Sequence, residues 1–295
     1  MKILVAVPVY NEEKYVTKVL REIRKYARVA GTGTGGVRVL VVNDGSTDGT
    51  AQVLTDLHQR GHIDLITHPE NRGYGQSLID AFAWATRHGY DWVITMDCDE
   101  QHEPCRIPCF VEACQRDDAD IISGSRYLSP ELQADQPPVD RRSINRVITD
   151  LLNSTLDLNV APPLLSADPC GSITPTSPAM EGQSDILTDS FCGFKAHRVA
   201  ALQTLHLSIP GYAFPMQFWV QAAKLRIREI PVKLIYKDAT RHFGGMLDDP
   251  SARLQHYLEV LTAELVRVRQ TVVLSPAPPP AGANVTACAC CGECD

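Results

Sequence analysis

Short runs of hydrophobic residues recur through the first half of the chain, and each ends in a cluster of polar residues. The runs cover residues 2–9, 37–42, 65–67, 92–96 and 120–127, the last one leading into a loop. Apolar runs bounded by polar residues are typical of strands buried on both faces of a parallel sheet. Segments with apolar residues at helical spacing separate them. We therefore predict a single-domain α/β fold with a mostly parallel, Rossmann-like sheet flanked by helices.

The second half of the chain contains two long segments with helical spacing, residues 141–158 and 253–273. Between them, residues 159–183 are rich in Pro, Ser, Gly and Ala and show no periodicity, which indicates a loop insertion or a lid. Pro and Ala dominate the end of the chain. We therefore assign residues 1–273 to one domain and residues 274–295 to a disordered tail.

Charge and hydropathy narrow the class of protein. A formal net charge of −7 argues against non-specific nucleic-acid binding. No uninterrupted apolar run approaches the roughly 18 residues that a spanning helix requires. The first apolar run leads directly into polar residues without a small-residue cleavage site, so we interpret it as a strand and expect a cytoplasmic protein.

Ten cysteines divide into two groups. Six are scattered through residues 98–192, which is typical of reduced thiols in a cytosolic protein. Four crowd residues 288–294. That cluster contains the C-x-x-C spacing of zinc ligands, but it lacks two separated pairs, and a disordered tail is the alternative.

Asp97 and Asp99 are the strongest candidates for chemistry. They directly follow the apolar run 92–96, and ligands of α/β sheets bind just beyond the carboxyl ends of the strands. Two carboxylates at this spacing can bind one hard cation such as Mg²⁺ or Mn²⁺, which commonly bridges to substrate phosphates. Gln101 can add a carbonyl oxygen. A polar turn without a metal is the alternative interpretation.

Six motifs occur along the chain in a fixed order. They are V-P-V-Y-N-E, V-V-N-D-G-S-T-D-G-T, N-R-G-Y-G-Q-S, M-D-C-D-E-Q-H-E-P, S-G-S-R-Y and D-S-F-C-G-F-K. Over residues 1–245 this order resembles family 2 glycosyltransferases, most of all the dolichyl- or polyprenyl-phosphate mannosyltransferase branch. The resemblance implies a GT-A fold, a nucleotide-sugar donor, a divalent metal and inversion of the anomeric centre.

The resemblance also implies a nucleotide site at the ends of the first two strands. Pro8, Tyr10 and Glu12 match the first nucleotide-contact loop, where Tyr10 can pack against the base or ribose. Val42 and Asp44 match the base-recognition strand end, where a carboxylate can accept N–H bonds from the base. The second motif departs from many relatives in that Asn takes the place of its first carboxylate.

Asp97 and Asp99 match the metal motif of the family, and Gln101 matches a third protein ligand. Cys98, between the two carboxylates, is a small residue that the motif tolerates. The metal would neutralise the diphosphate leaving group as the bond between sugar and phosphate breaks. Mg²⁺ and Mn²⁺ are both consistent with this motif.

Arginines match the phosphate-binding positions of the family. Arg126 matches one near the phosphates, Arg142 or Arg141 one that meets the acceptor phosphate, and Arg241 one that closes over the donor. The guanidinium fork suits phosphate geometry. A lipid phosphate is already ionised and needs no base, whereas a hydroxyl acceptor requires one, for which Asp189 is the candidate. The alternative for Asp189 is a helix cap or a loop residue.

We expect a metal-dependent transferase that moves mannose or glucose from a GDP- or UDP-sugar to a polyprenyl phosphate. The alternatives are the same fold acting on a glycan or soluble hydroxyl acceptor, which the 159–183 insertion favours, and a non-catalytic nucleotide-sugar binding protein. A polyprenyl-phosphate acceptor implies peripheral contact with the inner face of the membrane. The helix at 253–273 could provide that contact, although core packing is the simpler interpretation for it.

Overall fold

The computed structural model describes residues 1–31, 36–129, 132–133, 135–164, 185–236 and 242–274, without the side chains of 271–274. Arg241, most of the predicted 159–183 insertion and the cysteine-rich tail lie outside the described residues. The division into a domain at 1–273 and a tail at 274–295 therefore stays a prediction.

The described residues form one eight-stranded sheet, with the strand order β3-β2-β1-β4-β7-β5-β8-β6. The strands are β1 (Ile3–Val9), β2 (Val37–Asn43), β3 (Asp64–Thr67), β4 (Trp92–Thr95), β5 (Ile121–Ser125), β6 (Val160–Ala161), β7 (Lys195–Arg198) and β8 (Ile227–Pro231). All pairs are parallel except that β7 runs antiparallel to its neighbours β4 and β5. The chain order reverses between β1 and β4, which is where α/β sheets bind ligands.

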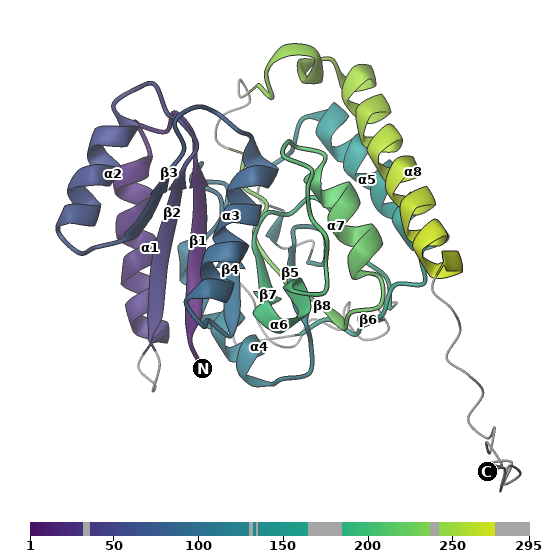
Figure 1. Ribbon diagram of the computed structural model, residues 1–295, viewed down its shortest axis with the longest axis horizontal. Helices are drawn as coiled ribbons and strands as arrows, with labels where there is room; N and C mark the ends of the chain where they lie inside the picture. Colours follow the sequence, from purple (N-terminus) through teal and green to yellow (C-terminus); the bar gives the residue numbers. More distant parts are fainter. Residues whose placement is uncertain (32–35, 130–131, 134, 165–184, 237–241, 275–295) are drawn as a thin grey trace, which may run out of the picture.

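Helices cover both faces of this sheet (Figure 1). They are α1 (Val16–Ala30), α2 (Thr50–Gln59), α3 (Tyr74–Arg87), α4 (Ile107–Gln115), α5 (Val139–Thr155), α6 (Val199–Leu202), α7 (Phe214–Ala222) and α8 (Pro250–Leu274), with short 3₁₀ turns η1 (Pro104–Arg106) and η4 (Gly245–Asp248). Side chains of α1, α2 and α4 share one hydrophobic cluster, and those of α3, α5, α6, α7 and α8 share the other.

Alternation along β1 shows how the sheet joins these two clusters. Ile3, Val5 and Val7 belong to the cluster under α1, whereas Leu4 and Ala6 belong to the cluster under α3. Because successive side chains of a strand point to opposite faces, a strand covered on both sides must be apolar throughout. The continuous apolar runs predicted as strands are therefore confirmed.

The antiparallel strand β7 is the main departure from the prediction. Its sequence, K-A-H-R, contains no apolar run, yet it lies between β4 and β5. The last strand in the chain, β8, ends at Pro231, directly opposite Ser125 at the end of its partner β5.

Helix α8 packs along α7 and α5, with Tyr257 and Leu261 buried in the core. None of the helices in the described part of the chain combines the length and the apolar composition needed to cross a bilayer. Cys98, Cys109, Cys114 and Cys192 are buried reduced thiols, as predicted. The same prediction is wrong for Cys105, which takes part in a disulfide bond.

Candidate active site

Two adjoining cavities open at the carboxyl ends of β1, β2 and β4. The wide cavity, of about 800 Å³, lies over the ends of β1 and β2. The inner cavity, of about 220 Å³, lies between the end of β4 and helices α5 and α8. Six residues line both cavities: Tyr74, Asp97, Asp99, Tyr212, His242 and Phe243. The two predicted carboxylates therefore lie at the junction of the cavities.

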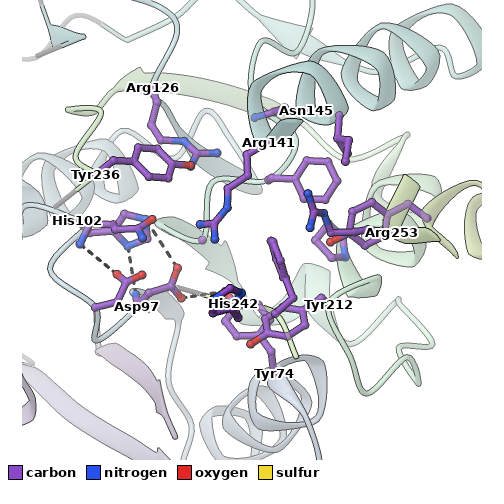
Figure 2. A pocket seen from close by; sticks show the side chains of 18 of the residues that line it. Tyr74, Asp97, His102, Arg126, Arg141, Asn145, Tyr212, Tyr236, His242 and Arg253 are labelled. Carbon is purple, nitrogen blue, oxygen red and sulfur yellow. Dashed lines mark hydrogen bonds and ion pairs between the residues drawn. The ribbon is translucent and has the colours of Figure 1, made fainter. Parts of the chain in front are cut away.

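Asp97 is held in place from two sides. The Tyr74 hydroxyl donates to Asp97 Oδ1 at 3.1 Å. On the other side lies Gly193, where an added Cβ would come within 2.5 Å of Asp97 Oδ2 and would force the carboxylate to shift. Asp99 Oδ1 accepts the backbone N–H of Gln101 at 3.1 Å. Figure 2 shows Asp97 facing the cavity below the arginines.

The donor set suits a hard cation. No group of three or more His, Cys, Asp or Glu side chains suited to a metal occurs within the described ranges. Mg²⁺, however, typically binds one or two carboxylates, keeps several waters and completes its shell with substrate phosphates. Asp97, Asp99 and the amide of Gln101 line the inner cavity and fit this mode. Cys98 lines the wide cavity, but its side chain belongs to the hydrophobic core.

His102 supports the carboxylate turn from beneath. Its Nδ1 accepts the backbone N–H of Asp97 at 3.2 Å, which leaves the ring proton on Nε2. Burial lowers the pKa of His102 to about 4, so the ring is neutral at physiological pH. This contact makes His102 a support for the backbone of Asp97.

Arg126 and Asp189 form a buried bidentate pair. Arg126 donates from Nε to Asp189 Oδ2 at 2.7 Å and from Nη2 to Oδ1 at 2.8 Å, and Asn145 donates to the same Oδ1. Burial alone would raise the pKa of Asp189, but the charge and hydrogen bonds of Arg126 outweigh it and the pKa is lowered. A paired carboxylate of lowered pKa is a poor proton acceptor, so this geometry favours positioning of Arg126.

Two further arginines reach the inner cavity. Arg141 of α5 lines it, whereas the neighbouring Arg142 is exposed and does not. Arg253 of α8 lies across the cavity from Arg141 (Figure 2). Their guanidinium carbons lie 4.9 Å and 4.4 Å from the centre of the Phe243 ring. Sequence reasoning missed Arg253, which lies in the first turn of α8, an otherwise ordinary amphipathic helix.

The wide cavity contains most of the predicted nucleotide-contact residues. Pro8, Tyr10, Glu12 and Asp44 line it, and Tyr10 is 45% exposed. Val42 does not reach the cavity because its side chain is buried under α3. The Asp44 carboxylate accepts backbone N–H bonds at 2.8 Å from both Arg72 and Gly73, which ties the following loop to the end of β2.

Comparisons with known proteins agree with this architecture. The model of glycosyl transferase family 2 matches residues 4–172. An undecaprenyl-phosphate mannosyltransferase of Micrococcus luteus is 27% identical over 84% of this chain and 90% of its own length. A UDP-N-acetylglucosamine–dolichyl-phosphate N-acetylglucosaminyltransferase of Methanococcus voltae is 24% identical over 80% of this chain and 86% of its own.

A solved structure shows the same fold. It is glucosyl-3-phosphoglycerate synthase from Mycobacterium tuberculosis in complex with Mn²⁺, uridine diphosphate and glucosyl-3-phosphoglycerate. The TM-score is 0.58 and the sequences are 17% identical, over 90% of this chain and 80% of the other. At this identity the likeness concerns the fold alone, and it confirms the predicted GT-A architecture.

Proposed function

The chain belongs to glycosyl transferase family 2, and from this premise we propose that it transfers a hexose from a nucleoside-diphosphate sugar to a polyprenyl phosphate. The reaction uses Mg²⁺ or Mn²⁺ and inverts the anomeric centre. That the protein is a glycosyltransferase follows from the family and its named relatives. The donor, the acceptor, the metal and the stereochemistry are the proposal.

The observation that carries this proposal is the position of Asp97 and Asp99 between two cavities of different chemistry. The wide cavity has room for a nucleoside diphosphate and is lined by Tyr10, Glu12 and Asp44. The inner cavity is lined by guanidinium groups and suits a phosphate. A donor in one cavity and an acceptor in the other would meet at the carboxylates.

In this arrangement Asp97, Asp99 and Gln101 would hold the divalent cation. When bound, the cation supplies charge neutralisation for the departing diphosphate. Tyr74 and Gly193 keep the Asp97 carboxylate in one orientation, through a hydrogen bond and through close contact. Tyr10 covers the nucleoside from the end of β1. Arg241, which lies outside the described residues, remains a proposed contact for the donor phosphates.

The acceptor phosphate would bind Arg126, Arg141 and Arg253. Its ionised oxygen attacks the anomeric carbon on the face opposite to the diphosphate, so the configuration inverts. The oxygen carries no proton, and no general base is required. This agrees with the geometry of Asp189, whose two carboxylate oxygens are both occupied by Arg126. Arg142, one of the two sequence candidates, is exposed and does not line the cavity.

A polyprenyl phosphate is embedded in a membrane, so the mouth of the inner cavity must approach a lipid surface. Val139 and Met246 are 81% and 71% exposed. They lie at the starts of α5 and η4, and an ion pair between Asp140 and Arg253 joins α5 to α8. We propose that these two apolar side chains make peripheral contact with the inner face of the membrane.

Transfer to a hydroxyl acceptor is the second candidate. The solved neighbour contains glucosyl-3-phosphoglycerate, and an arginine-lined cavity also suits a small phosphorylated acceptor. That reaction requires a base, and Asp189 is the sequence candidate, but its pairing with Arg126 disfavours it.

An acceptor panel separates the two candidates. The protein is incubated with UDP- and GDP-hexoses, Mn²⁺, and either a short-chain polyprenyl phosphate, 3-phosphoglycerate or a free sugar. We expect a sugar–phosphate diester only with the polyprenyl phosphate, with an inverted anomeric proton coupling by NMR. A glycoside formed on a hydroxyl instead would replace the first candidate with the second.

A further inference from the structure

The Asp44 carboxylate at the end of β2 has nearly all of its hydrogen-bonding capacity occupied. Oδ1 accepts the backbone N–H of Arg72 at 2.8 Å and faces His68 Nδ1 at 2.7 Å. Oδ2 accepts the backbone N–H of Gly73 at 2.8 Å. A carboxylate has about four acceptor positions, two on each oxygen. Within the described ranges, one position on Oδ2 remains for a ligand in the wide cavity, which Asp44 lines.

His68 is itself fixed on its far side. Its Nε2 lies 2.9 Å from Asp80 Oδ2 on α3, and the side chain is 4% exposed. Asp80 Oδ2 also accepts from Arg72 Nη1 at 3.3 Å, and Asp80 Oδ1 accepts from Gln76 Nε2 at 3.0 Å. The imidazole therefore lies between two carboxylates and cannot turn away from Asp44 without breaking two contacts.

The loop that donates to Asp44 has little freedom to move. Gly45 has a φ of +69°, and an added Cβ there would lie 2.2 Å from the carbonyl carbon of Glu70. Gly73 has a φ of +101°, and a Cβ there would lie 2.4 Å from the carbonyl oxygen of Pro210. The loop is thus packed between the end of β2 and the segment before α7. A ligand must therefore donate its hydrogen bond to the one acceptor position of Asp44 that this framework leaves.

We propose that the wide cavity selects a base with a single imide N–H, which is uracil or its 5-methyl analogue thymine, and that His68 is the positioning residue that enforces this choice through Asp44. The inference rests on the proposed function, because it specifies the donor of the same site. Uracil has a single ring N–H between two carbonyl oxygens, which matches one free acceptor position.

The other bases match this position less well. Guanine offers a ring N–H beside an amino group and needs an acceptor position on each carboxylate oxygen. Here the position on Oδ1 is filled, so one guanine N–H would stay unpaired, which is costly in a desolvated site. Cytosine and adenine turn a ring-nitrogen lone pair toward the carboxylate, which is repulsive. The expected donor is therefore a uridine- or thymidine-diphosphate sugar, and UDP serves as the probe for this class.

Calorimetric titration of the full chain with UDP, GDP and CDP in the presence of Mn²⁺ tests the inference without any variant. We expect UDP to bind at least about tenfold more tightly than GDP or CDP, which corresponds to about 1.4 kcal/mol. Tighter binding of GDP or CDP would overturn the base assignment and leave the proposed transferase intact. Binding of none of the three would overturn the proposed function as well.

Two substitutions of His68 test the positioning role. In His68→Asn the amide nitrogen replaces Nδ1 and can still donate to Asp44, whereas in His68→Gln it replaces Nε2 and reaches only Asp80. We expect H68N to retain most of the wild-type preference for UDP over GDP. We expect H68Q to narrow the ratio of GDP to UDP dissociation constants severalfold, because Oδ1 regains a free position. Thermal melting shows whether both variants are folded. If both are folded and both keep the wild-type ratio of GDP to UDP dissociation constants, His68 does not have this role.

Discussion

Asp189 accepts hydrogen bonds from both Nε and Nη2 of Arg126, at 2.7 and 2.8 Å, and the Asp189 carboxylate is completely buried. The two residues come from different motifs, 63 positions apart along the chain. The guanidinium is thereby held at the wall of the inner cavity. We infer from this relationship that Asp189 orients the guanidinium of Arg126, for which we propose phosphate binding, and does not act as a base.

Asp189→Asn tests that role. Removing one partner of a buried pair leaves the other charge uncompensated and typically costs about 3–5 kcal/mol of stability. We expect this loss in the free energy of unfolding, measured by urea denaturation, together with an increase in KM for the acceptor. A base would show itself differently, as a fall in kcat with an unchanged acceptor KM and a shifted pH profile.

Arg141→Ala and Arg142→Ala form a matched pair on α5. Only Arg141 lines the inner cavity. A charge-assisted hydrogen bond contributes about 1.5–3 kcal/mol, so we expect R141A to raise the acceptor KM by roughly 10- to 100-fold. We expect R142A to match the wild type in steady-state kinetics. Equal defects in both variants would contradict the orientation of α5.

Gly193→Ala tests the contact that fixes Asp97. A Cβ at this position would lie 2.5 Å from Asp97 Oδ2, which forces the carboxylate or the backbone to shift. We expect weaker Mn²⁺ binding, measured by electron paramagnetic resonance in the absence of substrate. Wild-type Mn²⁺ affinity in G193A would show that the position of Asp97 is not important for the metal.

Glu229 gives the protein a pH-dependent stability. Burial raises the pKa of Glu229 to about 7 from 4.5, although hydrogen bonds from Thr188 and the backbone of Asp189 oppose the shift. The folded state therefore binds this proton more tightly than the unfolded state. The contribution is fully present below about pH 4.5 and is lost as the pH rises through about 7, by about 3 kcal/mol.

Glu229→Gln removes this titration. Relative to the wild type, the free energy of unfolding of E229Q should depend less steeply on pH between about 4.5 and 7, as measured by urea denaturation at several pH values. E229Q should also lose stability at all pH values, because its amide replaces one of the two oxygens that accept from Thr188 and Asp189. If the free energies of unfolding of E229Q and the wild type changed in parallel with pH, burial of Glu229 would not raise its pKa.

The strands that carry the site could be predicted because their composition is unambiguous. β1, β2 and β4 are buried on both faces, so their apolar residues are continuous and the polar residues that follow identify the ligand edge. β7 could not be predicted in this way. Its buried Lys195 donates to the carbonyl oxygen of Cys192 and lies over the ring of Trp219, partners that no local pattern reveals.

The arginines of the inner cavity could likewise be predicted only in part from the sequence. The motif order identified Arg126 but allowed either Arg141 or Arg142, because the choice depends on the rotation of α5 about its axis. Arg253 is invisible to such reasoning, since its partner Asp140 lies 113 residues away. The motif order made Asp189 a candidate for the base, but the role that we propose for it depends on the contact with Arg126, which only the fold creates.

The central claim is that Asp97 and Asp99 join a nucleotide cavity to a phosphate cavity. Its most direct test is the initial rate of sugar–polyprenyl phosphate formation across a Mn²⁺ titration, in the wild type and in Asp99→Asn, with R142A as the folded control. We predict that the rate saturates with Mn²⁺ in the wild type and in R142A. In D99N we predict a rate lower by at least about 100-fold, because a transition-state contact worth about 3 kcal/mol is lost. Metal-independent transfer at wild-type rate in D99N would contradict the account.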